Sequence, residues 1–379
     1  MVAAVNRAAE RSKNAAPLTG DTVPTSSPAP SPPAHGEARL LPGLREARAH
    51  TSPAARLRAT RDAAHRARQA LLQDGVVAGV STCKLVTFPY PTQYAFQGMA
   101  LSPAPFVMMT NRMHVVRFVD HAGAPRVLLF NPSDYERNQT TPFFAKLRKK
   151  YGDFLADKVL AQRHGDVGQH LMKLGIDADD VDYVAYDHLH TQDVRRWLGS
   201  SSSGDRSLLP RAKLLVHKDE WATTKDLHPM QTPWYCPQGT DGIDDDRVQL
   251  LDDDLWLGQG TALVLTPGHT AGNMSLCVTT SKGIAVVSEN GVAAECYAPQ
   301  LSRIAGIRAS AARMTQEVVL NGNTREASLE QYSSMILERD LAQPLDDGEV
   351  PLFYPSSELT SHPIAAGLSP TVSHGDLAV

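Results

Sequence analysis

Histidines at the ends of two apolar runs constrain this chain most. The run 183–187 leads directly into His188 and His190, and the run 262–265 leads into a glycine-flanked turn that carries His269. Side chains alternate along a strand, so His188 and His190 point to the same side and can share one metal. With His269 as a third nitrogen ligand and a fourth position left open, the pattern predicts a catalytic zinc site.

At these residues the chain resembles the metallo-β-lactamase fold family. The family's HxHxDH loop matches 188–193, and its TPGHT turn matches 266–270. The resemblance implies an α/β (α+β) fold, a four-layer αββα metallo-β-lactamase-like sandwich. It also implies that His188, His190 and His269 hold a first metal. We expect one or two zinc ions, with iron or manganese as alternatives.

The sequence departs from the family at the second metal site. Gln192 and Asp193 stand where the family has Asp and His. The carboxylate of Asp193 can replace the lost histidine as a ligand, or it can cap the helix that follows. Gln192 can orient the attacking water by a hydrogen bond but cannot act as a base. These two residues are the candidate catalytic residues. Glu289 ends an apolar strand, where it either replaces the bridging aspartate or is a solvated turn residue.

The last ligand of the second site is also changed. Ser357 occupies the position of the family's final histidine, and Glu358 or His362 can substitute from the same loop. The sequence does not choose between them. His217 ends an apolar strand before a helix, and we expect it to support the site rather than to bind the metal. The polar segment 321–324 is a candidate pocket lining.

Composition indicates an ordinary globular protein. The chain has 379 residues and a formal net charge of −4. No run approaches the ~20 apolar residues that a membrane span needs. The first residues lack the apolar core of a secretory signal. The four cysteines are far apart and form no CxxC pair, so no disulfide framework is indicated. We therefore expect a cytoplasmic protein.

The N-terminal part differs from the rest. Residues 1–75 carry 11 Lys+Arg and 6 Asp+Glu, a charge of +5, which leaves −9 for the remainder. We expect a disordered Pro/Ala/Arg-rich tail at 1–53, a surface helix at 54–75, the catalytic domain at 76–365 and a C-terminal tail at 366–379. Deletion of 1–50 is expected to leave folding intact. An organelle-targeting segment and a nucleic-acid arm are the alternatives for this tail.

Hydrophobic periodicity predicts the elements of the domain. The predicted strands are 79–88, 106–120, 126–130, 182–187, 213–217, 261–266, 275–280, 284–288 and 350–354. The predicted helices are 141–150, 156–174, 302–319 and 326–342. Early strands, a helical middle, further strands and terminal helices favour a layered sandwich over a parallel barrel.

The resemblance and the site together predict a metal-dependent hydrolase. Its substrate is expected to be a small ester, lactone or thioester, by resemblance to the family. A nuclease is disfavoured because the domain is acidic and shows no basic, aromatic-interleaved patch. One alternative is a family member that has lost hydrolysis and keeps a single metal for binding or structure. Another is an iron-dependent redox protein of the same fold. The oligomeric state is left open.

Overall fold

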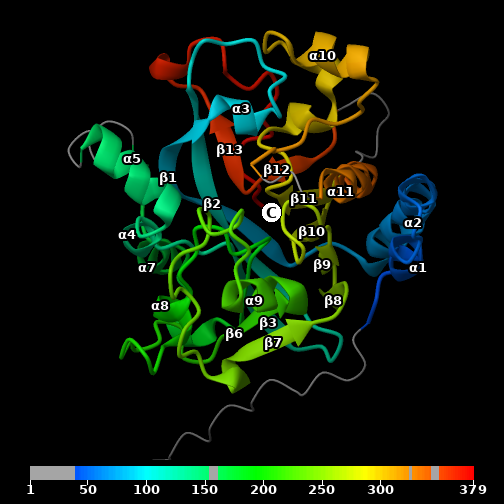
Figure 1. The fold of residues 1–379 in the computed structure, drawn as a ribbon. Coiled ribbons are helices and arrows are strands. Elements are labelled where there is room, and N and C mark those ends of the chain that lie inside the picture. The colour runs from blue at the N-terminus through cyan, green and yellow to red at the C-terminus, as the bar shows by residue number, and fades with distance from the viewer. Residues whose placement is uncertain (1–38, 153–160, 324–326, 343–349) are drawn as a thin grey trace, which may run out of the picture. The chain divides into compact units, whose positions relative to one another are not determined.

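The computed structural model describes residues 39–152, 161–323, 327–342 and 350–379. They belong to one compact unit, Glu37–Val379. Two β-sheets form its centre, and helices lie outside both of them (Figure 1). The predicted four-layer αββα sandwich is therefore confirmed.

The first sheet has eight strands, in the order β4-β1-β2-β3-β5-β6-β7, with β13 paired to β2. Its strands are β1 (Gly79–Pro91), β2 (Phe106–Val119), β3 (Pro125–Phe130), β4 (Gln162–Arg163), β5 (Tyr183–Ala185), β6 (Lys213–His217), β7 (Val248–Leu251) and β13 (Ser357–Thr360). The pairs from β3 to β7 are parallel, and the others are antiparallel. Parallel strands end at the same edge, so loops after them can share a site.

The second sheet has five strands, in the order β12-β11-β10-β9-β8. These are β8 (Leu255–Gly258), β9 (Thr261–Leu265), β10 (Met274–Thr280), β11 (Gly283–Ser288) and β12 (Phe353–Pro355). The helices are α1 (Leu44–Arg48), α2 (Pro53–Asp74), α3 (Thr92–Ala95), α4 (Tyr135–Asn138), α5 (Pro142–Tyr151), α7 (Val167–Lys173), α8 (Arg195–Leu198), α9 (Lys218–Lys225), α10 (Ile307–Met314) and α11 (Ser328–Leu341). Short 3-10 helices lie at Ala178–Asp180, Asp245–Arg247, Ala294–Tyr297, Pro299–Leu301 and Pro363–Ala365.

Three hydrophobic clusters fill the three spaces between the four layers. The middle cluster joins the sheets and includes Val116 of β2 and Leu263 of β9. A second cluster packs α2 and α11 on the outer face of the second sheet, through residues such as Val264. The third packs α7 and α8 on the outer face of the first sheet. Because Leu263 and Val264 are successive strand residues, they face opposite sides and enter different clusters.

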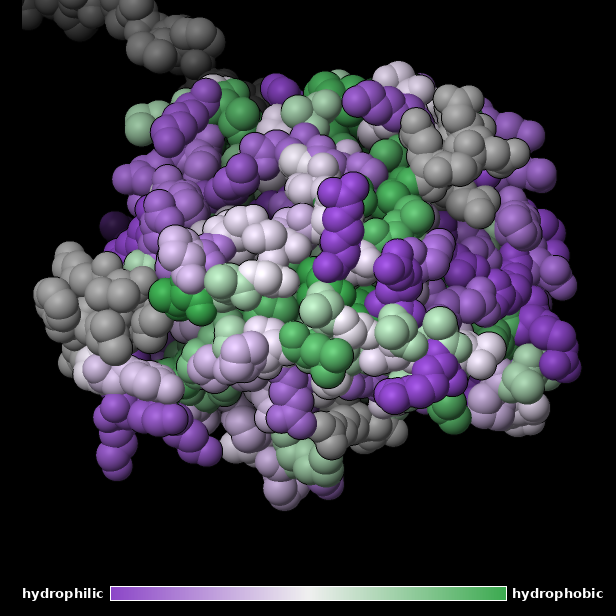
Figure 2. Space-filling model, turned by 90° about the horizontal axis from the view of Figure 1, so that it is seen from above, coloured by the Kyte–Doolittle hydropathy of each residue, from purple (hydrophilic) through white to green (hydrophobic). Residues whose placement is uncertain are grey.

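One face of the molecule is largely polar. Hydrophilic residues cover most of the face drawn in Figure 2, and hydrophobic residues form small groups between them. No helix of the described residues is long and apolar enough to cross a membrane. All four cysteines, Cys83, Cys236, Cys277 and Cys296, are free and buried.

The disordered tail expected at 1–53 includes residues that are ordered and packed in the structure. Residues 1–38 lie outside the described part of the chain, but α1 packs on the second sheet, and Leu41 and Leu44 are only 2% and 1% exposed. Arg45 and Arg48 form ion pairs with Asp253. Residues 39–50 are therefore packed on the domain, and we now expect their deletion to destabilise it. The buried residues of α1 are Leu44 and Ala47, three positions apart, and Leu41 is buried just before the helix.

The helix expected at 54–75 is present as α2, but it is not merely a surface helix. Ala63, Ala64, Ala67 and Leu71 are fully buried, and α2 packs on α11. Alanines at helical spacing allow two helices to approach closely, and their small size hid this apolar face.

The C-terminal tail expected at 366–379 is also packed. The backbone of Leu377 accepts a hydrogen bond from the backbone N–H of Thr82 in β1, at 3.0 Å. The side chain of Leu377 is 4% exposed and joins the middle cluster. The buried carboxylate of Glu295 accepts hydrogen bonds from the Thr371 hydroxyl and the Val372 N–H. Pairing with an open strand edge, which composition cannot reveal, orders this segment.

Some predicted elements are shorter than expected. The helix predicted at 156–174 begins only at Val167, because Asp166 and Gln169 form a capping box there; its first residues, 156–160, lie outside the described part. The helix predicted at 302–319 covers Ile307–Met314, after Gly306 with a φ of 93°. Strands β4, β7, β8 and β13 were not predicted, and β4, at Gln162–Arg163, lies where the sequence predicted a helix.

Candidate metal centre

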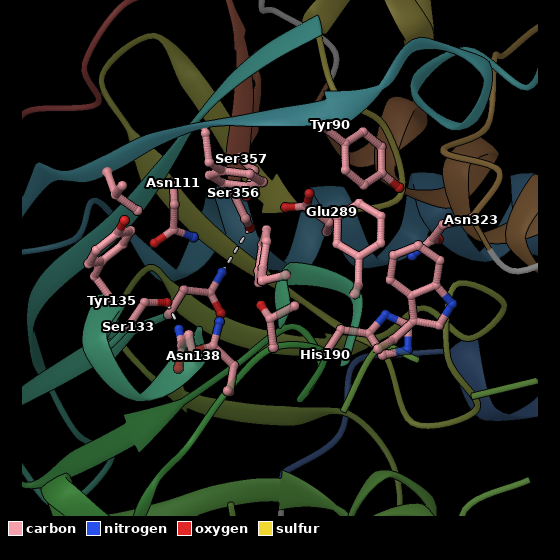
Figure 3. Close-up of a pocket in the computed structure, with 18 of the residues that line it drawn as sticks. Tyr90, Asn111, Ser133, Tyr135, Asn138, His190, Glu289, Asn323, Ser356 and Ser357 are labelled. Atoms are coloured by element: carbon pink, nitrogen blue, oxygen red, sulfur yellow. Dashed lines mark hydrogen bonds between the residues drawn. The ribbon is translucent and has the colours of Figure 1, made fainter. Parts of the chain in front are cut away.

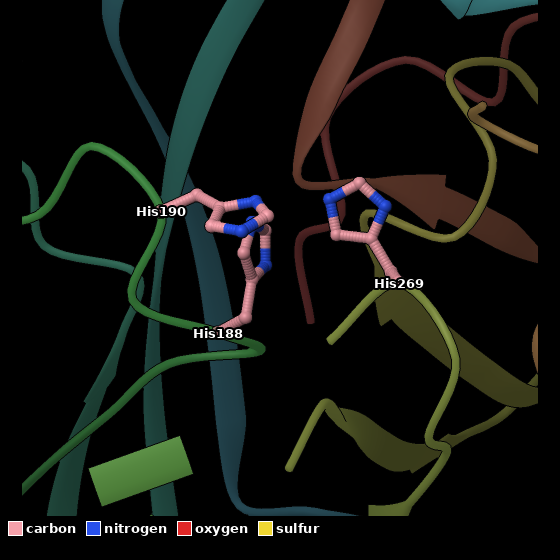
Figure 4. Close-up of side chains that lie close together, drawn as sticks. All are labelled: His188, His190 and His269. Atoms are coloured by element: carbon pink, nitrogen blue, oxygen red, sulfur yellow. The ribbon is translucent and has the colours of Figure 1, made fainter. Parts of the chain in front are cut away.

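The three histidines of the motifs come together from both sheets (Figure 4). His188 and His190 follow β5 of the first sheet, and His269 follows β9 of the second. The ring centroids of His188 and His269 lie 4.5 Å apart, and those of His188 and His190 lie 4.6 Å apart. One ligand nitrogen from each ring lies within 4.8 Å of the others. A tetrahedral zinc with Zn–N bonds of 2.0–2.1 Å requires nitrogens about 3.4 Å apart, so small ring rotations suffice.

The turn that carries His269 depends on glycine. Gly268 has a φ of +134°, which residues with a side chain rarely adopt. A Cβ at this position would also lie 2.1 Å from the backbone nitrogen of Gln331 in α11. The turn is closed by a hydrogen bond from the backbone N–H of Gly268 to the carbonyl of Thr270, at 2.8 Å. Glycine therefore lets the turn lie against α11 and aim His269 at the other two rings.

The residue before the first histidine supports its ring. Asp187 is buried, and its Oδ1 lies 2.8 Å from Nδ1 of His188. Its Oδ2 accepts a hydrogen bond from Nδ2 of Asn131 at 3.1 Å. Burial acts to raise the pKa of Asp187, but the neighbouring His188 and hydrogen bonds with His188 and Ser356 outweigh burial and lower it. Oδ1 of Asp187 accepts the backbone N–H of His188 at 2.7 Å, and its contact with Nδ1 is close but not an aligned hydrogen bond. Asp187 therefore holds the backbone and places a negative charge beside the ring of His188.

A glutamine supports the second histidine by a contact with its ring. Oε1 of Gln231 lies 3.0 Å from Nε2 of His190, so this nitrogen donates and Nδ1 keeps its lone pair. Among the described residues Nδ1 of His190 is buried without a hydrogen-bond partner. Burial lowers the pKa of both His190 and His269 well below the usual value, with the neighbouring His188 adding to the effect. Neutral, buried imidazoles of this kind fit a divalent metal.

Asp193 does not join the histidines. Its carboxylate is bound by the side chain of Arg195, with Oδ2 at 2.5 Å from Nη2, and it also accepts the backbone N–H of Arg195 at 3.1 Å. Nη1 of Arg137 lies 3.7 Å from Oδ1. The structure therefore places Asp193 just before α8, in an ion pair with Arg195. The N-cap residue of α8 is Val194, so Asp193 is neither grouped with the histidines nor the N-cap itself.

Gln192 does line the pocket beside the histidines. Its Oε1 accepts a hydrogen bond from the Ser133 hydroxyl at 2.9 Å and a longer one from Nδ2 of Asn138 at 3.4 Å. The amide oxygen is thus used within the protein, and Nε2 is left as the group that can donate to a ligand.

Glu289 lines the same pocket but stands apart from the three-histidine cluster. Burial raises its pKa well above the usual value, and the neighbouring Asp187 raises it further. Hydrogen bonds with the side chain and backbone of Ser357 act in the opposite direction. Glu289 therefore pairs with the serine that replaces the family's last histidine, and it is not the solvated turn residue of the alternative.

The remaining candidates lie away from the histidines. Glu358 binds Nη1 of Arg112 at 2.8 Å and the Ser373 hydroxyl at 2.9 Å. His362 accepts the backbone N–H of Ile364 at 3.3 Å, as a cap. His217 caps α9 in the same manner. None of the three belongs to the cluster of possible ligands found in the described residues.

The histidines lie in a pocket of about 140 Å³ (Figure 3). Asn321 and Asn323 line it, as predicted for the segment 321–324, of which Thr324 lies outside the described residues. One side of the pocket is polar. The lining residues on that side are Asn111, Asn131, Ser133, Asn138, Gln192, Ser356 and Ser357.

Aromatic rings form the other wall and lead to the metal site. Phe88 contacts Phe144 edge to face, with centroids 5.8 Å apart, and Phe143 lies 4.9 Å from Trp234. The ring of Trp234 in turn lies 6.2 Å from His190. The helix α5, which carries Phe143 and Phe144, has no fully buried residue. Its large apolar residues line the pocket, and Phe143 also packs against the third hydrophobic cluster.

Sequence reasoning missed the supporting residues. Asp187 was visible as the residue before His188, and its carboxylate at a strand end was the available signal. Glu220 accepts the backbone N–H of Leu189 from 31 positions away, and Gln231 reaches His190 from 41 positions away. Nothing in the local sequence marks these two contacts.

Comparisons with known proteins add structural likenesses. No family model matches the sequence, and no curated protein matches it. Among solved structures, the chain is similar to AidC, a dizinc quorum-quenching lactonase in complex with a product, at 13% identity over 80% of this chain and 95% of that chain, with a TM-score of 0.48. It is also similar to a quorum-quenching N-acyl homoserine lactone lactonase, at 15% identity over 64% of this chain and 87% of that chain, with a TM-score of 0.41. At such identities a likeness says nothing of the substrate, which must follow from this chain's own residues.

Proposed function

We propose that the protein is a metal-dependent hydrolase of a small ester, lactone or thioester with an apolar acyl group. The observation that carries this proposal is the position of His188, His190 and His269 in one pocket with an aromatic wall. The donor set and its buried, neutral imidazoles fit zinc, with iron or manganese as alternatives.

A divalent ion held there would lower the pKa of a bound water and polarise the scissile carbonyl. The protein's own residues orient the histidines and bind the substrate or water. Asp187 holds the backbone at His188, and Gln231 fixes the orientation and tautomer of His190. Gln192, whose oxygen is held by Ser133, keeps its Nε2 donors for a substrate oxygen or for water.

The aromatic wall supports the choice of an acyl substrate. Phe143, Phe144, Leu147 and Trp234 line the pocket on the way to the histidines. Burial of an alkyl chain against them is worth about 0.8 kcal/mol for each CH₂ group. The partner we propose is therefore a small molecule with an apolar chain, bound so that its carbonyl lies at the metal.

The test combines metal analysis with a substrate panel. Protein purified without added metal is assayed for zinc, iron and manganese, and its activity is measured on p-nitrophenyl esters of two to ten carbons. We expect activity that rises with chain length and disappears after chelation. His269→Ala should lose both metal and activity, whereas His121→Ala, far from the site in the β2–β3 turn, should retain both. Full activity in the metal-free protein would contradict the proposal.

A second candidate is a protein that binds one metal without hydrolysis. It is favoured by the second site, where Asp193 is held by Arg195 and Ser357 replaces a histidine. One bound ion per chain with no turnover of any ester or lactone would support it. The iron-dependent redox alternative was suggested by a carboxylate-richer second site, and the ion pair of Asp193 with Arg195 engages one of its two carboxylates. The absence of visible absorbance in freshly purified protein would argue against it independently.

A further inference from the structure

Three amide side chains that line the pocket have a buried oxygen without a hydrogen-bond partner among the described residues, Asn323 on one side and two others together on the opposite side (Figure 3). The two that lie together carry the inference. Asn111, in β2, and Asn138, the last residue of α4, are each 9% exposed and line the pocket. Among the described residues, Oδ1 of neither side chain has a hydrogen-bond partner. Buried polar atoms in folded proteins are nearly always hydrogen-bonded, so such exceptions call for a reason. Two acceptors in one pocket indicate that a ligand supplies the donors.

The placement of Asn111 follows from an irregularity in the first sheet. The pairing of β1 with β2 shifts between Lys84 and Val86, opposite Asn111. A bulge of this kind redirects side chains and is frequent beside functional sites. On its other side Asn111 is paired with Ser357 of β13, the residue that hydrogen-bonds Glu289. The bulge therefore brings the amide to the region of the altered second metal site.

Asn138 reaches the same side of the pocket from a different element. Its Nδ2 donates to Oε1 of Gln192, which also accepts the Ser133 hydroxyl. The amide nitrogen of Asn138 is thus engaged, and the oxygen is the atom left over. Figure 3 shows Asn111, Ser133 and Asn138 on one side of the pocket, away from Asn323.

We propose that Asn111 and Asn138 form a recognition subsite for a neutral hydrogen-bond donor of the substrate, a hydroxyl or a carboxamide N–H. The identity of the ligand as a substrate rests on the proposed function, but the subsite itself does not. A neutral donor fits because both acceptors are uncharged, and the nearby carboxylates are already bound, Asp187 by Asn131 and Glu289 by Ser357. A ligand without the donor leaves both oxygens unsatisfied, which is a strong basis for discrimination.

The experiment compares two uncharged probes of the same shape. Hexanamide and 2-heptanone differ only in an NH₂ group against a CH₃ group, and the Kd of each for the full-length protein is measured by calorimetry. We expect hexanamide to bind at least about tenfold more tightly, since one hydrogen bond is worth about this factor. Asn111→Leu and Asn138→Leu should each reduce the preference to less than about threefold and leave the Kd of 2-heptanone unchanged. Asn138→Asp, which keeps an acceptor, should retain the preference.

A control variant and a second readout complete the design. Leu147→Ala, on the apolar side of the pocket, should weaken both probes equally. Thermal melting identifies any variant that fails to fold. If a leucine variant fails to fold, the preference for hexanamide in Asn138→Asp decides whether the subsite stands. The subsite would be overturned if the wild-type protein binds neither probe or shows no preference for hexanamide. It would also be overturned if both leucine variants retain that preference. If the protein prefers hexanamide but holds no metal and hydrolyses no ester, the subsite is supported and the proposed function is contradicted.

Discussion

Glu220 accepts a hydrogen bond from the backbone N–H of Leu189 at 2.7 Å, between the two histidines of the HxH loop. The same carboxylate oxygen accepts the hydroxyl of Tyr235 at 2.9 Å. Glu220 is 1% exposed and belongs to α9, which follows β6. A buried side chain of a helix thus holds the backbone that aims His188 and His190.

Removal of this carboxylate should damage both stability and the site. We expect Glu220→Ala to lower the free energy of unfolding by about 2–3 kcal/mol, because two hydrogen bonds to a buried carboxylate are lost. The affinity for zinc should fall with it, since the loop is no longer held. Urea unfolding and zinc titration measure the two effects. Asp219→Ala, one position away and exposed, is the matched control and should change stability by less than about 0.5 kcal/mol.

Gln231 should act on metal affinity more than on folding. Its side chain is only half-buried, and it contacts Nε2 of His190. We expect Gln231→Leu to weaken zinc binding about 10–100-fold, as is usual for the loss of a histidine's outer partner. Gln231→Glu keeps the acceptor and should retain the affinity. Equal zinc affinities for the leucine variant and the wild type would show that the contact does not orient the ring.

Asp193 should matter for stability and not for metal content. Asp193→Ala removes the ion pair with Arg195 and a backbone hydrogen bond at the start of α8. We expect a loss of about 1–3 kcal/mol in the free energy of unfolding, because the lost bonds involve a buried charge. Zinc stoichiometry per chain, measured by elemental analysis, should be unchanged. A lower stoichiometry would make Asp193 a ligand after all.

Two truncations separate the packed part of the N-terminal segment from the rest. Removal of 1–38 should leave the melting temperature unchanged, because this sequence lacks hydrophobic periodicity. Removal of 1–50 also deletes Leu41 and Leu44, each fully buried, and should cost about 3 kcal/mol or more. It also leaves Asp254, buried beside the strand end before His269, without Arg48. Identical melting curves for the two truncations would show that α1 contributes nothing.

Asp120 should show a defined dependence on pH. Burial acts to raise its pKa, but hydrogen bonds from Ala124, Arg126 and Ala122 outweigh burial and lower it. A carboxyl with a lowered pKa stabilises the fold above its unfolded pKa, and this stability is lost as the pH falls through the folded pKa. We therefore expect Asp120→Asn to cost about 0.5–1 kcal/mol at pH 7 and at pH 5, and less below about pH 4.

Urea unfolding of both proteins from pH 7 to the lowest pH at which they remain folded is the measurement. Asp120→Asn keeps an acceptor for the turn, so the difference reports the charge and the pairing with Arg126. A cost that grows as the pH falls would contradict the assignment.

The predictable part of the site is the part that is local in sequence. His188, His190 and the turn around His269 were recognised because each motif is only a few residues long and contains a glycine turn or two histidines two positions apart. The strand before His188 ends at Ala185, so the two histidines are carried by the loop rather than by the strand. The contacts that hold them, from Glu220 and Gln231, cross 31 and 41 positions and depend on how α9 and the following loop pack. Asp193 was undecided because a carboxylate suits a metal and a helix start equally well, and only the position of Arg195 settles which it meets.

The same division holds for the fold. Long strands such as β1 and β2 were predicted because their apolar residues recur over more than ten positions. The segments around Leu44 and Leu377 were assigned to tails, since a short apolar stretch is buried only when a complementary surface exists elsewhere. Such surfaces are properties of the assembled sheets and helices, not of the segments themselves.

Gly272, at the end of the His269 turn, lies so close to α9 that a Cβ there would stand 2.4 Å from the backbone nitrogen of Glu220. One histidine-bearing loop therefore rests directly on the helix that steadies the other. Gly272 has only a hydrogen atom where other residues have a Cβ, and this allows its loop to lie against α9. A methyl group at this position would push the two loops apart. The backbone contact between Gly272 and α9 thus sets the spacing of the three histidine rings, independently of a metal ion.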